Sequence, residues 1–145
     1  MAKDFDGWNT LKKRIDARSD TSKVYFSERQ AWWAQIGLNV GFEQDGKGTL
    51  AQRPVLVLRK FNKQVLLVLP LSTRHKPGNK YYFNFMCPDG MERSAILSQI
   101  RLIDIRRLTE HMFVVEEQIF LGINKAVVDM ISDRFIEHSS SQKAR

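Results

Sequence analysis

Two short apolar runs on either side of a small polar turn constrain the fold of this chain most strongly. Residues 55–58 read Val-Leu-Val-Leu, residues 65–71 read Val-Leu-Leu-Val-Leu-Pro-Leu, and Phe61-Asn62-Lys63 lies between them. Apolar runs of this length bounded by Gly, Asn and Pro predict a β-hairpin. A glycine-spaced polar loop, residues 39–48, precedes the first run, and the hydroxyl pair Ser72-Thr73 ends the second. Polar groups at strand ends are often displayed for function.

The rest of the chain divides into further short strands and one helix near each end. Apolar residues at spacings of three and four predict an amphipathic helix over residues 4–18 and a stronger one over residues 116–137. The first helix is either a basic clamp for nucleic acid or, as we favour, a helix that packs its apolar face on the main body. Strands are predicted at residues 24–26, 29–38, 80–86, 94–104 and 112–115.

This pattern of elements predicts a mainly β protein with terminal helices. Six or seven short strands joined by tight turns favour a small, strongly bent antiparallel β-barrel. The length of 145 residues suits one domain. Within it we distinguish an N-terminal helical extension (residues 1–28), a barrel with the C-terminal helix (residues 29–137) and a flexible tail (residues 138–145).

Composition narrows the possible partners and sites. Lys and Arg exceed Asp and Glu by 23 to 16, so the surface either attracts a polyanion or serves solubility. Cys87 is the only cysteine, which excludes a disulfide or a thiolate metal cluster within one chain. The apolar runs are too short to span a membrane, and the charged N-terminus does not resemble a secretion signal. We therefore expect a cytoplasmic protein.

Common catalytic motifs are absent from the sequence. There is no phosphate-binding glycine loop, no Gly-x-Ser-x-Gly and no pair of histidines at helical spacing. The three histidines, His75, His111 and His138, are far apart in the chain. If the protein is an enzyme, it is expected to use side chains alone, without a metal or another cofactor.

Several polar motifs follow one another in an order that resembles a known family. They are Asn-Val-Gly-Phe-Glu-Gln-Asp-Gly at 39–46, Arg-Pro-Val at 53–55, Pro-Leu-Ser-Thr at 70–73 and Ser-Ala-Ile-Leu-Ser-Gln-Ile-Arg at 94–101, with Asp104 and Arg107-Leu108 after them. In this order the chain, over about residues 29–136, resembles a PemK/MazF-type toxin of a type II toxin–antitoxin system.

The resemblance implies a homodimer of small SH3-like barrels that cuts single-stranded RNA without a metal and is inhibited by a cognate antitoxin. It implies catalytic roles for Glu43, Arg53 and Ser72. Ser72 stands where the family usually has Thr, and Thr73 is next in line, so both hydroxyls are candidates. Substrate-binding roles are expected for Gln44, His75, Gln99 and Arg101.

Elementary chemistry agrees with these expectations. RNA carries its own nucleophile, the 2′-hydroxyl, and attack on the adjacent phosphorus gives a 2′,3′-cyclic phosphate and a 5′-hydroxyl. Arg53 offers permanently charged donors to the phosphoryl oxygens, and Glu43 is the better general base if burial raises its pKa. The alternatives are a non-catalytic nucleic-acid-binding barrel and an inactive toxin-like subunit that only sequesters antitoxin.

Overall fold

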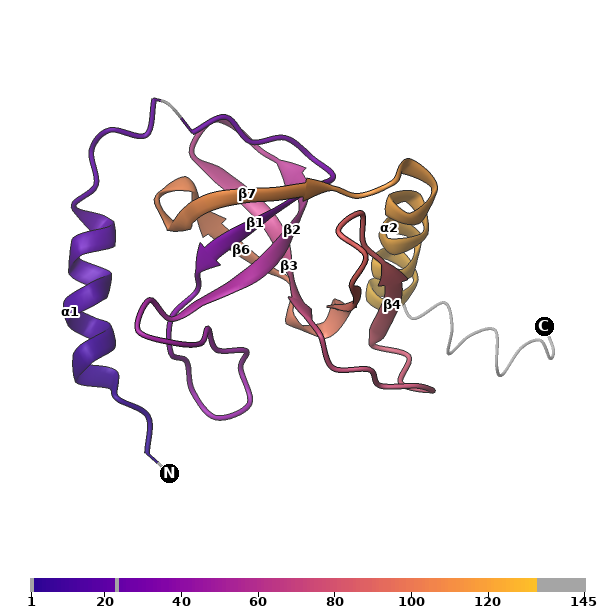
Figure 1. The fold of residues 1–145 in the computed structure, drawn as a ribbon, viewed down its shortest axis with the longest axis horizontal. Coiled ribbons are helices and arrows are strands. Elements are labelled where there is room, and N and C mark those ends of the chain that lie inside the picture. The colour runs from indigo at the N-terminus through magenta and orange to yellow at the C-terminus, as the bar shows by residue number, and fades with distance from the viewer. Residues whose placement is uncertain (1, 23, 133–145) are drawn as a thin grey trace, which may run out of the picture.

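The computed structural model describes residues 2–22 and 24–132, which form a strongly curved sheet with one helix on each side (Figure 1). The elements in chain order are α1 (Phe5–Asp16), β1 (Gln30–Gln35), β2 (Gln52–Lys60), β3 (Val65–Ser72), β4 (Tyr82–Met86), β5 (Glu92–Ile96), β6 (Arg101–Asp104), β7 (Leu108–Val114) and α2 (Glu117–Ser132). Short 3₁₀ turns, Leu97–Gln99 and Ile105–Arg107, flank β6.

The predicted hairpin is confirmed and lies at the centre of the sheet. Strands β2 and β3 pair antiparallel with Leu56 opposite Leu69, and the turn between them contains Phe61-Asn62-Lys63. Asn62 closes the turn because its side-chain oxygen accepts from the backbone N–H groups of Gln64 and Val65, at 2.7 and 3.0 Å. Both faces of the hairpin are buried, which explains its continuous apolar sequence.

Strand β3 bends and pairs with different strands along its two halves. Its first half, Val65–Val68, pairs with β6, and its end, Leu71 and Ser72, pairs with β5. The single long strand predicted over residues 94–104 is therefore wrong. The 3₁₀ turn Leu97–Gln99 divides it into β5 and β6, because one straight strand cannot follow the bend of β3.

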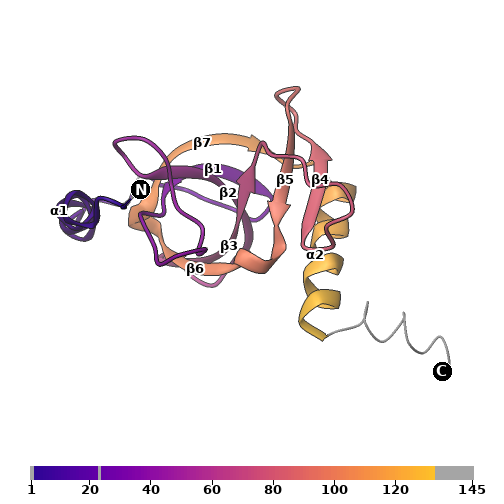
Figure 2. The ribbon, with the colours of Figure 1, turned by 90° about the horizontal axis from the view of Figure 1, so that it is seen from below.

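The sheet curls around a core without closing. Its order is β4-β5-β3-β2-β1-β7, with β6 attached to β3, and the path begins at β4 and ends at β7. Viewed from below, the strands surround a centre while α1 and α2 lie on opposite sides (Figure 2). The predicted antiparallel barrel is thus correct in its strong curvature and strand count but is not closed by hydrogen bonds.

Alternate residues of β2 serve two separate apolar cores. Val55 and Val57 face the inside of the curl, together with Trp32, Leu66 and Ile103. Leu56 and Leu58 face the other way and pack in a second core, to which α2 contributes Phe120, Ile123 and Val127. The two tryptophans of β1 point to opposite faces, as predicted from the pleat, with Trp32 buried and Trp33 half-buried.

The two terminal helices confirm their predicted positions within the described residues. Helix α1 begins after Asp4, whose carboxylate caps Gly7 N–H at 2.9 Å, and it packs on the body through Trp8 and Ile15. Helix α2 covers β4, and the part of its predicted range beyond Ser132 lies outside the described residues, as do the predicted tail and His138.

The strand predicted at residues 24–26 is wrong. These residues have no strand partner, but Phe26 is buried in the inner core and Tyr25 is exposed. Lys60 holds Phe26 in place, because its ammonium lies 4.5 Å from the ring centroid and donates to the Phe26 carbonyl at 3.0 Å. The segment is thus held on the inner core by Phe26 and by the partly buried Val24, without β pairing.

Candidate functional site

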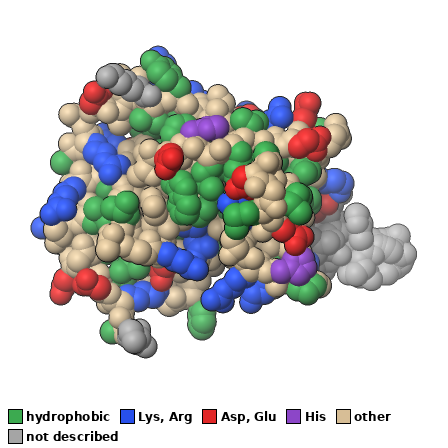
Figure 3. Space-filling model, viewed as in Figure 1, with side chains coloured by type: hydrophobic (Ala, Val, Ile, Leu, Met, Phe, Trp, Pro, Cys, Tyr) green, Lys and Arg blue, Asp and Glu red, His purple; other side chains and the backbone are tan. Residues whose placement is uncertain are grey.

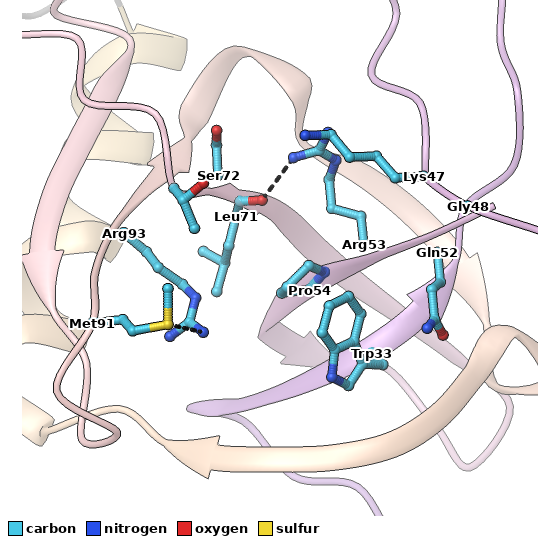
Figure 4. A pocket seen from close by; sticks show the side chains of 11 residues that line it. Trp33, Lys47, Gly48, Gln52, Arg53, Pro54, Leu71, Ser72, Met91 and Arg93 are labelled. Carbon is cyan, nitrogen blue, oxygen red and sulfur yellow. Dashed lines mark hydrogen bonds between the residues drawn. The ribbon is translucent and has the colours of Figure 1, made fainter. Parts of the chain in front are cut away.

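A cavity of about 450 Å³ opens where β1, β2, β3 and β5 meet, and we call it the Arg53 pocket (Figure 4). In this view one side carries Trp33, Pro54 and Arg53, the other carries Met91 and Arg93, and Leu71 and Ser72 lie between them. The complete lining is Trp33, Lys47, Gly48, Gln52, Arg53, Pro54, Leu71, Ser72, Thr73, Met91 and Arg93. The pocket therefore combines apolar walls with three cationic side chains.

Arg53 is held rigidly at the start of β2. Its side chain is only 9% exposed, its Nε donates to the Asp45 carbonyl at 2.8 Å, and its Nη1 donates to the Leu71 carbonyl at 3.1 Å. Burial, and then the nearby charge of Arg74, lower the pKa of Arg53 from its usual value. A bound anion would stabilise the charged guanidinium against both its burial and its repulsion by Arg74, so Arg53 is well placed to bind one.

The two hydroxyl candidates at the end of β3 differ in setting. Ser72 is 9% exposed, and its Oγ accepts from Arg74 N–H at 3.0 Å, which leaves the hydroxyl hydrogen available to another acceptor. Thr73 is exposed and lines only the Arg53 pocket. Ser72 also lines the neighbouring hollow, so its position favours it over Thr73 as a donor to a bound anion.

That neighbouring hollow, of about 200 Å³, shares Lys47, Arg53 and Ser72 with the Arg53 pocket, and we call it the cationic recess. Four of its lining residues are cationic: Lys47, Arg53, Arg74 and Lys76. Among the described residues, no Asp, Glu or His lines either cavity. Like charges gathered without a carboxylate are typical of a phosphate-binding surface.

Glu43 lies in a third cavity, of about 350 Å³, which we call the Glu43 pocket. Its lining residues are Asn39, Glu43, Gln44, Ser98, Gln99, Ile100 and Arg101. Gln44 lines both this pocket and the cationic recess and so stands between Glu43 and Arg53. With its amide turned over, the Gln44 oxygen lies 2.9 Å from Arg53 Nη2, which links the two pockets directly.

The predicted substrate-binding residues Gln99 and Arg101 contact the protein in this structure. Gln99 accepts from Gln44 N–H at 3.0 Å and donates to the Phe42 carbonyl at 3.0 Å, which fixes the loop at residues 42–44. Arg101 is half-buried, and burial lowers its pKa while the charge of Glu43 partly opposes this effect. Arg101 still lines the Glu43 pocket and can meet an anion there.

Two predicted residues lie differently from the sequence expectation. The Glu43 side chain is exposed and accepts from Val40 N–H at 2.9 Å, so the burial that the general-base hypothesis invoked is not found. His75 is half-exposed, and its Nδ1 lies 3.9 Å from Glu92 Oε1. It does not line the three cavities, so the structure does not bring it together with Arg53 or Glu43.

Sequence reasoning missed most of the cations around Arg53. Arg74 directly follows the hydroxyl pair, Lys76 comes two residues later, and Lys47 lies between two glycines of the polar loop, so these signals were present in the sequence. Arg93 is different. It joins the pocket only because β5 pairs with the end of β3, which no local pattern indicates.

On the face shown in Figure 3, hydrophobic side chains gather near the centre and Lys and Arg side chains border them.

Within residues 2–22 and 24–132, no group of three or more His, Cys, Asp or Glu side chains is arranged to hold a metal ion. The helices in the same ranges are too short or too polar to cross a membrane.

Residues 30–131 match the model of a protein family, the PemK-like, MazF-like toxins of type II toxin–antitoxin systems. The chain belongs to this family. Toxins of the family are in general endoribonucleases. The match begins at β1 and ends in α2, so helix α1 lies outside it. No curated protein matches the sequence.

Solved structures of family members share the fold. MazF of Deinococcus radiodurans has 18% sequence identity and a TM-score of 0.62, covering 74% of this chain and 98% of its own. MazF in a MazE–MazF structure from the same organism has 15% identity and a TM-score of 0.56, covering 74% and 97%. The toxin MazF-mt6 of Mycobacterium tuberculosis has 14% identity and a TM-score of 0.55, covering 72% and 97%.

Proposed function

We propose that this protein is the toxin of a type II toxin–antitoxin system and cleaves single-stranded RNA, including mRNA, at specific sequences. The observation that carries the proposal is the Arg53 pocket with its cationic recess. A buried arginine, a serine hydroxyl whose hydrogen is available to an acceptor, and four further Lys or Arg side chains converge there without a carboxylate among the described residues. An RNA phosphate supplies the negative charge that this set lacks.

The proposed reaction uses the 2′-hydroxyl of the substrate as nucleophile. Its oxygen loses a proton and attacks the adjacent phosphorus, the bond from phosphorus to the 5′-oxygen breaks, and that oxygen takes a proton from water. The products are a 2′,3′-cyclic phosphate and a 5′-hydroxyl. Arg53 and Ser72 would donate to the phosphoryl oxygens as negative charge grows on them. We propose that no metal takes part.

Glu43 is the proposed acceptor of the proton. It is the carboxylate of the pocket next to the cationic recess, and only Gln44 separates the two cavities. One Glu43 oxygen is engaged by Val40 N–H, which leaves the other free to face the substrate. Arg101 lines the same pocket and is placed to contact a neighbouring phosphate, while Gln44 and Gln99 shape the wall between the sites.

The partners follow from the same proposal. The named MazE–MazF structures suggest an antitoxin partner for this chain as well, and we propose a cognate antitoxin that blocks the RNA site. We further propose a homodimer in the cytoplasm. Helix α2 supports an assembly, because Leu121, Val128 and Ile131 are more than half exposed on it.

The test is incubation of the purified protein with a long single-stranded RNA, with and without a strong chelator. We expect cleavage in both cases, with 5′-hydroxyl ends that polynucleotide kinase labels and cyclic phosphates that mass spectrometry identifies. A matched DNA should remain intact, because it lacks the 2′-hydroxyl. Cleavage lost with the chelator would contradict the metal-free chemistry. RNA that is bound but not cut would indicate the non-catalytic barrel. Binding of an antitoxin without binding of RNA would indicate the subunit that only sequesters antitoxin.

A further inference from the structure

Helix α1 lies outside the family match, yet it packs against the end of β1, where the chain enters the loop that carries Glu43. Trp8 is 9% exposed and packs directly on Gly37, where an added Cβ would come within 2.2 Å of the Trp8 ring. Gly37 also has a φ of +86°, so glycine is required there for two reasons. At the far end of the helix, Arg18 donates to Gln35 Oε1 at 2.6 Å. These contacts fix the helix relative to β1.

Lys3, just before this helix, reaches over the loop of residues 39–45. Its Nζ lies 2.9 Å from Asp45 Oδ2 and donates to the carbonyls of Asn39, at 2.6 Å, and Gly41, at 3.1 Å. The three acceptors match the three hydrogens of an ammonium group. Lys3 and Asp45 each retain 26% of their side-chain exposure, so water screens the pair only in part.

Asp45 connects Lys3 to Arg53. Its Oδ1 accepts from Asn39 N–H at 2.6 Å, and its backbone carbonyl accepts from Arg53 Nε at 2.8 Å. Asn39 in turn donates from its side chain to the Gln44 carbonyl at 2.7 Å. A chain of direct contacts therefore runs from Lys3 through Asp45 to Arg53. Through Asn39 it also reaches Gln44, which lies between the Glu43 pocket and the cationic recess.

We propose that Lys3 is a positioning residue for the site: it holds Asp45 so that the Asp45 carbonyl aims the Arg53 guanidinium into the pocket. The N-terminal segment is then part of the working site, although it lies outside the family match. This inference rests on the proposed ribonuclease function. It predicts that removing the Lys3 charge loosens residues 39–46 and misplaces Arg53, whereas removing a charge on helix α1 does neither.

The test compares full-length Lys3→Met with Lys3→Arg and with Lys13→Met. Lys13 is an exposed cation on the same helix with no side-chain contact to the loop, so it controls for net charge and for helix stability. We expect Lys3→Met to lower kcat for RNA cleavage by about tenfold or more, since misplacing a reacting group by ~1 Å costs up to about 10²-fold. KM should change less, Lys3→Arg should restore part of kcat, and Lys13→Met should resemble the wild type.

Hydrogen exchange separates this inference from the ribonuclease proposal, because it needs no activity. In Lys3→Met, amides of residues 39–46 should exchange faster, while those of the β2–β3 hairpin should not change. Unaltered exchange in the loop would overturn the inference, whether or not the protein cleaves RNA. A loss of kcat equal in Lys3→Met and Lys13→Met would also overturn it. If Lys3→Met speeds exchange in the loop but the wild-type protein does not cleave RNA, the proposed effect of Lys3 on the loop stands and the ribonuclease proposal is rejected.

Discussion

The Arg53 pocket and the Glu43 pocket are neighbours, but they are built in different ways. Arg53 and Ser72 extend from the central strands β2 and β3, both 9% exposed and both held by backbone groups. Glu43 extends from a polar loop, is exposed, and is held by Val40 N–H of the same loop. The strands thus fix the backbone of the cationic half of the site before substrate binds, and Arg53 has one further contact with the loop, at the Asp45 carbonyl, whereas the carboxylate half depends on the conformation of that loop alone.

This difference teaches which half of the site should respond to which change. Ser72, at the end of β3, is expected to lose function only when it is itself replaced. Glu43 lies on the loop and Arg53 is bonded to the Asp45 carbonyl of that loop, so both are expected to respond as well to contacts made far away, such as those of Lys3 with Asp45 and Gly41. Single substitutions in each half of the site test this contrast.

Arg53→Ala should give the largest loss, about 10²–10³-fold in kcat, as for other single donors to a charged transition state. Arg53→Lys should recover little, because a lysine cannot reproduce the bonds of Nε and Nη1 to two different carbonyls. Arg59→Ala, an exposed arginine on the same strand, is the matched control and should cleave normally. Single-turnover cleavage of a labelled RNA measures all three. Normal cleavage by Arg53→Ala would remove the Arg53 pocket from the reaction.

Glu43→Gln should slow cleavage by about 10²-fold, the lower end of the range for a general base. The amide keeps an oxygen for Val40 N–H, so the loop and the melting temperature should not change. The pH–rate profile is the decisive measurement, because loss of the base should abolish the dependence on its ionisation. A variant that retains both its rate and its pH profile would show that the Glu43 pocket only binds RNA.

Ser72→Ala and Thr73→Val distinguish the two hydroxyls at the end of β3. We expect a loss of about fivefold in kcat for Ser72→Ala, as for one neutral hydrogen bond of about 1 kcal/mol. Thr73→Val should lose less than about threefold, because Thr73 is exposed and outside the cationic recess. The opposite order would transfer the phosphate contact to Thr73.

Lys47→Met should change kcat least of all, and its effect should be a fall in RNA affinity by a factor of about three to ten. Lys47 is exposed and lines both the Arg53 pocket and the cationic recess, so it can contact a phosphate without being buried. Titrations at several salt concentrations should show the slope of log K against log salt reduced by about 0.7, the value for one phosphate of a single strand. An unchanged slope would place the RNA backbone elsewhere.

The sequence predicted the strand half of the site better than the loop half. Arg53-Pro54 directly precedes an apolar run, and Ser72-Thr73 directly follows one, so pairing the two runs in a hairpin already brings these residues to one end of it. The exposure of Glu43 could not be predicted in this way. It depends on Gln99, which bonds the loop across 55 positions of the chain, and on Lys3.

The fold shows the same limit. Hydrophobic patterns located the hairpin and both helices, because each buries its apolar residues in a regular period. They failed over residues 94–104, where the division into β5 and β6 follows from the bend of the neighbouring strand β3. They also failed at Phe26, where a single buried ring anchors the chain without strand pairing.

We propose that the phosphate to be cleaved lies against Arg53. This contact can be tested by replacing one non-bridging oxygen of that phosphate with sulfur, a weaker acceptor, in a short RNA cut at one position. The sulfur should slow cleavage by the wild type, should slow Arg53→Ala little further, and should slow Glu43→Gln as much as the wild type. The reason is that the effects of two changes are non-additive only where the changed groups are in contact. If the sulfur effect and the Arg53→Ala effect simply multiply, Arg53 does not contact that phosphate and the account is wrong.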